Sequence, residues 1–253
     1  MRASKTLISL LLVVFAVLFS LGFWGRSGDV GTSDHWYLLS IKGEPSGYLH
    51  VSRRPSDQPL APVLFVHDIV TRTKSESRDI HIETHCQDDP YYYPVSATAT
   101  IRKPGDPMAS LTVIVEKKVP YGASKAKMFI TYDTGSKQRN LKKDILEHTV
   151  PSHVLMEIIP LLPVQEGTVF EFNLFDTDKL KPLKKHKIDY LGLDQVEIAG
   201  RAVNLHKFRH KGSGVKETIF WTDDNHQVLR CLRDKKEELL LSTQAEVKKL
   251  IRS

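Results

Sequence analysis

The feature that most constrains the fold of this chain is a series of short runs in which apolar and polar residues alternate, separated by turn residues. The run HWYLLSIK ends at the turn residues GEPSG, YLHVSRR follows it, and similar runs recur as far as HQVLRCLRD. An alternation of period two places successive side chains on opposite faces of a strand, and closely spaced turns predict antiparallel hairpins. We therefore expect a mainly β protein built on one antiparallel sheet.

Two segments depart from this pattern and predict helices. In VPSHVLMEIIP the apolar residues recur at helical spacing, which predicts a helix from Ser152 to Ile159 with Ser152 as its N-cap. Pro160 is expected to end this helix, because the residue before a proline avoids the α region. The C-terminal segment STQAEVKKLIR predicts an amphipathic helix capped by Ser242 or Thr243.

Residues 1–25 have the pattern of an export segment. Arg2 and Lys5 precede the uncharged residues 6–24, a run that is just long enough to cross a bilayer as a helix. The small residues of Ser-Leu-Gly at 20–22 also fit a cleavage site. The pattern therefore predicts one N-terminal apolar helix, which is either a single-pass inner-membrane anchor or a signal peptide that is removed on secretion to the periplasm.

A positive start on the cytoplasmic side places the rest of the chain on the extracytoplasmic face of the cell envelope. Residues 26–34 are rich in Gly and Ser and predict a linker, and residues 35–253 predict a single β-rich extracytoplasmic domain. In an oxidising compartment Cys86 and Cys231 could form one disulfide, although a core of this size does not require it.

The basic residues are too few and too dispersed for a nucleic-acid-binding protein, since 36 Lys and Arg face 30 Asp and Glu. Two short basic stretches, KPLKKHK and LHKFRHK, predict a contact surface for anionic lipid head groups or envelope polymer. In the second stretch, strand alternation puts His206, Phe208 and His210 on the face opposite to the basic residues. The alternative is that these side chains are solvated and protect a sheet edge. The candidate contact residues are Lys184, Lys185, Lys187, Lys207, Arg209 and Lys211.

Two clusters contain residue types that bind metals, but strands and turns explain both. Asp223, Asp224 and Asn225 lie between two alternating runs, where a tight hairpin turn needs such residues. In HIETHC, His81 and His85 share a strand face but lie roughly 13 Å apart at about 3.3 Å per residue, too far for one zinc ion. No local catalytic motif such as Gly-x-Ser-x-Gly or His-Glu-x-x-His occurs. We therefore predict a protein that is not an enzyme, with no catalytic, cofactor-binding or metal-binding residues.

The turn and strand signatures of the second half resemble a known family. LLPVQEGTVFEFNLFD is followed by IDYLGLDQVEIAGRAVNLHKF and TIFWTDDNHQVLRCL, and SIKGEPSGYLHVS near the start resembles the opening hairpin of the same family. This is a family of uncharacterised exported bacterial proteins, similar in architecture to the LolA/LolB-type lipoprotein-carrier half-barrels. The resemblance implies a strongly curved antiparallel sheet with an apolar interior and a helix on or in its concave face, and it brings no catalytic residues.

The expected half-barrel suggests three functions, because a curved sheet encloses either a filled core or a ligand cavity. The first is a membrane-tethered, non-catalytic envelope domain that binds an apolar or lipid-like ligand. Its cavity would be lined by side chains such as Phe65, Ile114, Phe129 and Phe172. The second is a structural or adaptor domain that contacts an envelope protein through its basic surface. The third is a hydrolase or metalloprotein whose site is assembled across strands.

Overall fold

A computed structural model describes residues 31–73, 77–103, 109–116, 125–134, 136–176 and 181–252. The predicted export segment and most of the predicted linker lie outside these residues. The first strand begins at Ser33, so the last two residues of the predicted linker belong to the sheet. Residues 32–253 form one compact unit, which is mainly β, as expected.

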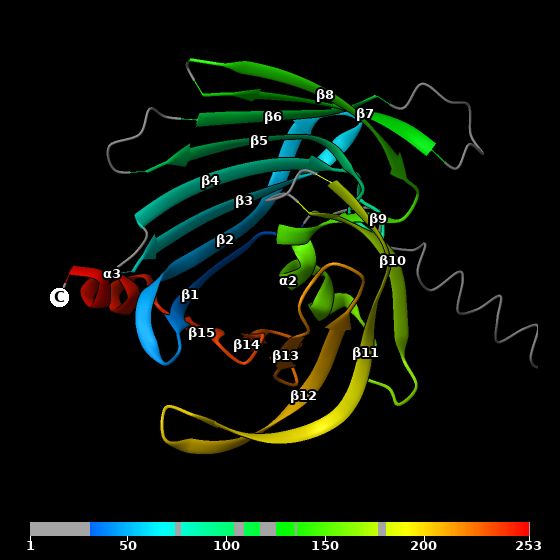
Figure 1. The fold of residues 1–253 in the computed structure, drawn as a ribbon. Helices are drawn as coiled ribbons and strands as arrows, with labels where there is room; N and C mark the ends of the chain where they lie inside the picture. Colours follow the sequence, from blue (N-terminus) through cyan, green and yellow to red (C-terminus); the bar gives the residue numbers. More distant parts are fainter. Residues whose placement is uncertain are drawn as a thin grey trace, which may run out of the picture. The chain divides into compact units, whose positions relative to one another are not determined.

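Fifteen strands make one large, curved and nearly closed sheet (Figure 1). The first arm contains β1 (Ser33–Ile41), β2 (Glu44–Gln58), β3 (Ala61–Arg72), β4 (Ser77–Cys86), β5 (Pro94–Arg102), β6 (Ala109–Glu116), β7 (Lys125–Asp133) and β8 (Gln138–Leu146). The second arm contains β9 (Thr149–Pro151), β10 (Val169–Asp176), β11 (Lys181–Ile198), β12 (Arg201–Lys211), β13 (Thr218–Thr222), β14 (Val228–Arg233) and β15 (Glu237–Ser242).

The two arms meet where β1 pairs with β15, so the two ends of the sheet-forming chain lie side by side. From this pair the strands follow in sequence order in both directions, out to β8 on one side and β9 on the other. These two edge strands are consecutive in the chain but do not pair with each other. All described pairings are antiparallel except that of β9 with β10.

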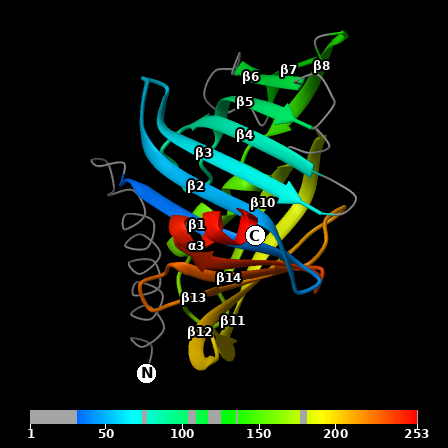
Figure 2. The same cartoon turned by 90° about the vertical axis from the view of Figure 1, so that its left-hand side faces the viewer.

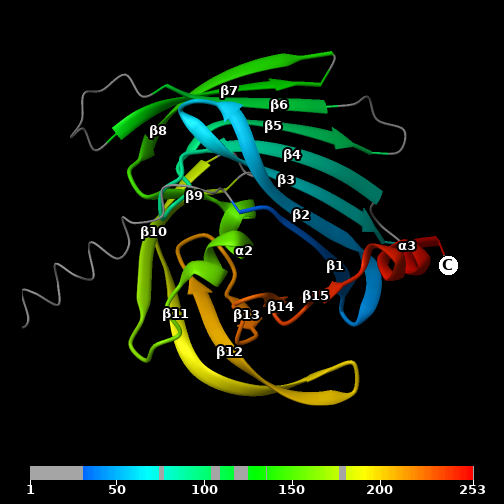
Figure 3. The same cartoon turned by 180° about the vertical axis from the view of Figure 1, so that it is seen from behind.

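The parallel pairing of β9 with β10 explains why helical structure interrupts the meander. Parallel neighbours cannot be joined by a tight turn and need a crossover connection. Residues 152–168 provide this connection, and Figures 1 and 3 show its helical part on the concave side of the sheet. This helical part consists of η1 (Ser152–Val154), α2 (Leu155–Ile158) and η2 (Ile159–Leu161), and we call residues 152–161 the plug segment.

The plug segment differs from the single capped helix that its sequence predicts. The N-cap position is Pro151 and no side chain caps the first turn, so the prediction of Ser152 as a cap is wrong. Pro160 does not end the helical structure at Ile159 either, because it lies in the first turn of η2. Proline is tolerated there, since the first turn needs no intrahelical bond from its N–H.

The C-terminal helix α3 (Gln244–Arg252) agrees with its prediction. The Thr243 Oγ1 accepts a hydrogen bond from the Glu246 backbone N–H at 3.2 Å, and the Glu246 carboxylate accepts one from the Thr243 N–H at 3.1 Å. This reciprocal capping confirms Thr243 as the cap. The helix lies beside β1 and β2 (Figure 2), where Val247 is buried and the Lys248 ammonium stands 5.8 Å from the Trp36 ring centroid.

Candidate functional site

The four predicted lining residues do not all lie on the same face of the sheet. Phe65 on β3 is fully buried, with its ring 4.9 Å from that of Tyr92. Phe172 on β10 is also buried. Phe129 lies on the face of β7 opposite to its buried neighbours, and the Lys142 ammonium stands 5.2 Å from its ring centroid. Ile114 belongs to β6, whose side chains lie outside the described part of the chain. The structure thus places Phe65 and Phe172 in the interior and Phe129 on the outer face.

The plug segment meets the first arm of the sheet through His153. Its Nε2 lies 2.7 Å from the Thr84 hydroxyl on β4, and its ring packs edge-on against that of His67 on β3 at 4.8 Å. Both histidines are buried. Among the described residues, Nδ1 and Nε2 of His67 and Nδ1 of His153 have no hydrogen-bond partner. Buried polar atoms are nearly always paired, so these three nitrogens are an exception within the interior.

Burial keeps these imidazoles neutral. It lowers the pKa of His153 to about 3. It also lowers the pKa of His67 well below its usual range, and repulsion by His153 and His50 adds to this effect. The backbone of His153 approaches the His67 ring and acts in the opposite direction on this pKa, but the contact does not have the geometry of a full hydrogen bond and does not cancel the shift.

Glu157 is a further polar residue of the plug segment, four residues after His153 and therefore on the same helical face. Glu157 is buried, and its carboxylate accepts a hydrogen bond from the Ser33 hydroxyl of β1 at 3.3 Å. Burial raises the pKa of Glu157, although Arg53 on β2, His35 on β1 and Ser33 all act in the opposite direction. The plug segment therefore presents an imidazole and a carboxyl group to strands β1 to β4.

Two side chains hold the basic groups around Glu157. The Arg53 guanidinium donates a hydrogen bond to the Tyr92 hydroxyl at 3.1 Å, and Gln227 lies 3.2 Å from Nδ1 of His35. Burial, and then the charge of Glu157, raise the pKa of the nearby Tyr37 hydroxyl. The Glu157 carboxyl group thus accepts a hydrogen bond from Ser33 and lies within the electrostatic influence of Arg53 and His35, whose side chains contact Tyr92 and Gln227.

A second pair of neighbouring imidazoles belongs to the second arm, with His186 on β11 and His210 on β12. His186 Nδ1 and His210 Nε2 are 3.0 Å apart, so that one nitrogen donates and the other accepts, and Phe172 stacks on His210. Burial, and then repulsion by His186 and Arg233, lower the pKa of His210 to about 4. A Cβ on Gly212 would lie 2.1 Å from the His186 ring, so the turn after β12 can approach this closely only with glycine.

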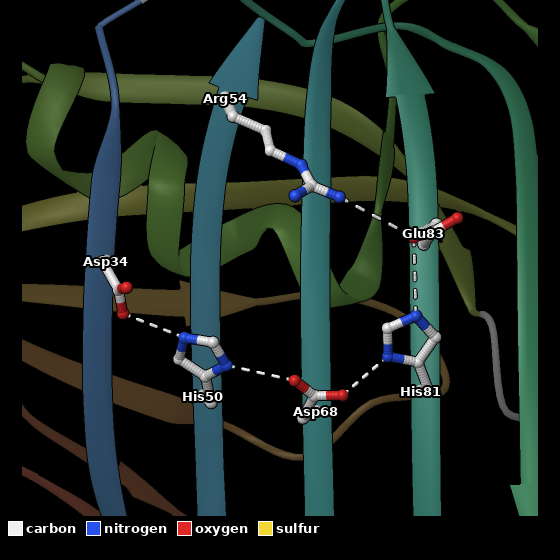
Figure 4. Close-up of polar contacts among 6 residues, drawn as sticks. All are labelled: Asp34, His50, Arg54, Asp68, His81 and Glu83. Atoms are coloured by element: carbon white, nitrogen blue, oxygen red, sulfur yellow. Dashed lines mark hydrogen bonds and ion pairs between the residues drawn. The ribbon is translucent and has the colours of Figure 1, made fainter. Parts of the chain in front are cut away.

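The outer face of strands β1 to β4 carries a different polar group, which we call the outer ladder (Figure 4). Its members are Asp34, His50, Arg54, Asp68, His81 and Glu83. His50, Asp68 and His81 are direct cross-strand neighbours. His50 contacts Asp34 at 2.9 Å and Asp68 at 3.0 Å, and His81 contacts Asp68 at 2.6 Å.

The outer ladder satisfies its own hydrogen bonds. A carboxylate only accepts, so both contacts of His50 are hydrogen bonds when both of its ring nitrogens carry protons. Partial burial raises the pKa of Asp68, but the hydrogen bonds and charges of His81 and His50 outweigh it, and the pKa is lowered. The ladder therefore ties four strands together through alternating carboxylates and imidazoles.

The predicted hairpin and strand readings of the two metal-like clusters are confirmed. Residues 223–227 form the turn between β13 and β14, where the Asp223 carboxylate accepts hydrogen bonds from the backbone N–H groups of Asn225 and Gln227. His81 and His85 lie on β4 and contact different partners, Asp68 and Ser56. In the described residues, no group of three or more His, Cys, Asp or Glu side chains is arranged to hold a metal ion.

The predicted basic surface is partly neutralised by carboxylates. Lys187 and Arg209 both pair with Asp189, at 2.9 and 3.1 Å, and Lys207 pairs with Asp194 at 2.9 Å. Of the remaining candidate residues, Lys184 and Lys185 are exposed and Lys211 is half-buried. The predicted division of this strand into two faces is confirmed. His210 and Phe208 are buried, whereas Lys207 and Arg209 on the other face pair with these carboxylates. β11 and β12 are interior strands, so Lys187, Lys207 and Arg209 do not protect a sheet edge, whereas Lys184 and Lys185 are solvated as the alternative expects.

Sequence reasoning missed the polar face of the plug segment. The signal was present, because His153 and Glu157 have the i, i+4 spacing of one helical face and His67 interrupts the apolar run VLFV. The apolar residues of this run predict a buried strand, but they do not indicate that the histidine after them is buried as well.

The two cysteines, Cys86 and Cys231, are buried and unbonded in the structure. No helix within the described ranges combines the length and the apolar character needed to span a membrane. Compared with known proteins, the chain matches no family model, no curated protein and no solved structure, so its own geometry carries the functional argument.

Proposed function

We propose that this protein is a non-catalytic binding domain of the cell envelope, whose concave face takes up an apolar or lipid-like ligand. Apolar side chains of both arms face the interior, and the plug segment covers them from the concave side. The observation that carries the proposal is the set of buried imidazole nitrogens on His67 and His153 that no described residue satisfies. A ligand with a polar end and an apolar body would supply both the missing hydrogen bonds and the apolar contacts.

The plug segment is suited to give way to such a ligand. Its α-helical part is only four residues long and carries no side-chain cap, so its structure depends on packing rather than on helix propensity. Val154, Ile158 and Ile159 are fully buried and occupy interior volume that the apolar part of a ligand would take over. The alternative role of an adaptor with a basic contact surface has less support, because Lys187, Lys207 and Arg209 are paired with carboxylates.

Ligand recovery and uptake test the proposal directly. The full chain is purified without added lipid, extracted with organic solvent and examined by mass spectrometry. It is then mixed with phosphatidylcholine vesicles that contain a fluorescent acyl lipid. We expect a co-purified amphiphile and transfer of the fluorescent lipid to the protein.

A matched pair of variants locates the uptake. Ala99→Leu adds volume to the inner face of β5, whereas Thr98→Leu adds the same residue to the exposed neighbouring position. Uptake should fall several-fold in the first variant and stay unchanged in the second, with folding checked by thermal melts. Absence of both bound amphiphile and uptake, or stoichiometric co-purification of a protein partner instead, would overturn the proposal.

A further inference from the structure

We propose that the ligand carries a carboxylate, and that this carboxylate binds where Glu157 of the plug segment now lies. The plug segment is then an internal competitor that the ligand displaces. This inference rests on the proposed function, because it names the chemical class of the same ligand.

The subsite for the carboxylate is built by the sheet and not by the plug segment. Ser33 and His35 come from β1 and Arg53 comes from β2, whereas Glu157 alone reaches them from the crossover. The Ser33 hydroxyl donates to the Glu157 carboxylate at 3.3 Å, and the Arg53 guanidinium is fixed by Tyr92 at 3.1 Å. If the plug segment leaves, these donors lose the carboxyl group that faces them, and a ligand carboxylate in the same place would restore the hydrogen bond from Ser33 and the attraction to Arg53.

The plug segment has the chemistry of the ligand that would replace it. One face presents the carboxyl group of Glu157, and the neighbouring aliphatic side chains of Val154 and Ile158 are fully buried. A long-chain carboxylate combines the same two features in one small molecule. Its tail would take the place of the aliphatic side chains, and its head group would take the place of Glu157.

Glu157 is a replaceable occupant of this subsite. Burial raises the pKa of Glu157. The ionised carboxylate therefore loses more solvation free energy on docking than its contacts with the sheet return. His153 lies on the same face of the plug segment as Glu157 and packs against His67 of β3, so the same movement would uncover both imidazoles.

Binding of three probes with one tail tests the assignment: oleate, oleyl alcohol and oleyl phosphate. Their dissociation constants are measured on the full chain by competition with a fluorescent acyl probe. In the wild type, oleate should bind about 10-fold more tightly than oleyl alcohol, since a charge-assisted hydrogen bond contributes more than a neutral one. Tighter binding of oleyl phosphate than of oleate would overturn the carboxylate assignment.

Variants of the subsite should change the preference for oleate and not merely the overall affinity. Arg53→Gln should reduce the ratio of oleate to alcohol affinity by about 10-fold, and Arg53→Lys, which keeps the charge, should preserve most of it. Arg54→Gln is the matched control, because its side chain lies on the other face of β2, toward Glu83. Glu157→Ala should raise the ratio, since it empties the subsite, whereas Glu171→Ala on the exposed face of β10 should not.

Two further readouts separate the possible failures. Oleate should increase amide hydrogen exchange across residues 153–161, and it should do so less in Arg53→Gln. If oleate and oleyl alcohol bind equally and Arg53→Gln leaves their ratio unchanged, the carboxylate subsite is wrong while the proposed function stands. If none of the three probes binds to the wild type or to Glu157→Ala, the proposed function itself is wrong.

Discussion

Strands β1 to β4 carry histidines and charged residues on both faces, and the hydrogen bonding of these residues differs between the two faces. His67 and Asp68 are adjacent on β3, yet His67 faces the plug segment and Asp68 belongs to the outer ladder. The ladder imidazole of His50 contacts carboxylates through both ring nitrogens. Among the described residues, neither ring nitrogen of His67 has a hydrogen-bond partner.

This contrast separates groups that hold the sheet together from groups that await a partner. Asp34, His50, Asp68 and His81 of the outer ladder each contact a side chain on a neighbouring strand, and Arg54 reaches past β3 to Glu83 on β4. On the inner face, ring nitrogens of His67 and His153 lack hydrogen bonds of full geometry. Burial disfavours the charged forms of these histidines and of Glu157. Accordingly the pKa of Asp68 is lowered whereas the pKa of Glu157 is raised. Polar groups that a fold buries without satisfying them indicate binding more strongly than exposed clusters of the same residues.

Acidification should destabilise the fold through the buried histidines of the interior. Of the changes considered, it should lower the free energy of unfolding the most. Burial lowers the pKa values of His153 and His210 to about 3 and 4, against about 6.5 in the unfolded chain. The unfolded chain therefore takes up protons first, and stability is lost as the pH falls from 6.5 toward these folded pKa values. At about 1.4 kcal/mol per pKa unit, the free energy of unfolding should fall on the order of 5 kcal/mol between pH 7 and pH 4, measured by urea denaturation.

A pair of variants connects this loss to the inner face. His67→Leu removes a buried imidazole whose pKa is lowered, so it should make the dependence on pH shallower. Thr98→Leu changes an exposed position on the outer face of β5 without removing a titratable group, so it should keep the slope of the wild type. The raised pKa of Glu157 acts in the opposite sense, because the folded protein gains its proton first as the pH falls. Equal slopes in the two variants would contradict the contrast between the faces.

Two phenylalanines give a second comparison between the interior and the outer face. Phe65→Ala removes a fully buried ring and should cost about 3–5 kcal/mol of unfolding free energy. Phe129→Ala removes a half-buried outer ring that contacts Lys142, and should cost roughly 1 kcal/mol. Chemical denaturation of both variants at pH 7 measures the difference. Similar losses would mean that the outer face of β7 is packed as tightly as the interior.

The sequence allowed the local features of this fold to be predicted, because they depend on neighbouring residues. Alternation revealed the strands, turn residues revealed the hairpin at 223–227, and the cap Thr243 marked the start of α3. The pairing of β1 with β15 joins residues about 200 positions apart, and no local pattern specifies it. The parallel pair β9 and β10, which forces the plug segment to cross the concave side, is non-local in the same sense.

The candidate site was harder to predict than the fold, for a related reason. A histidine such as His153 in an apolar segment can be a satisfied core residue or an unsatisfied one, and only its spatial neighbours distinguish these cases. Strand alternation did predict that His210 and Lys207 lie on opposite faces of their strand. It could not predict that Phe129 lies outside, because the face of a strand that points inward is set by the curvature of the whole sheet.

Asp68→Asn tests how much the outer ladder contributes to stability, and it has the smallest expected effect. The substitution keeps a hydrogen-bond acceptor but removes the charge that faces His50 and His81. Because these groups are partly exposed, the loss should be about 1 kcal/mol at low salt and less at 1 M salt, where surface charges are screened. Asp57→Asn, at an exposed position near the end of β2, serves as the control. A salt-independent loss of several kcal/mol would show that the ladder is a buried network, and its contrast with the plug segment would then disappear.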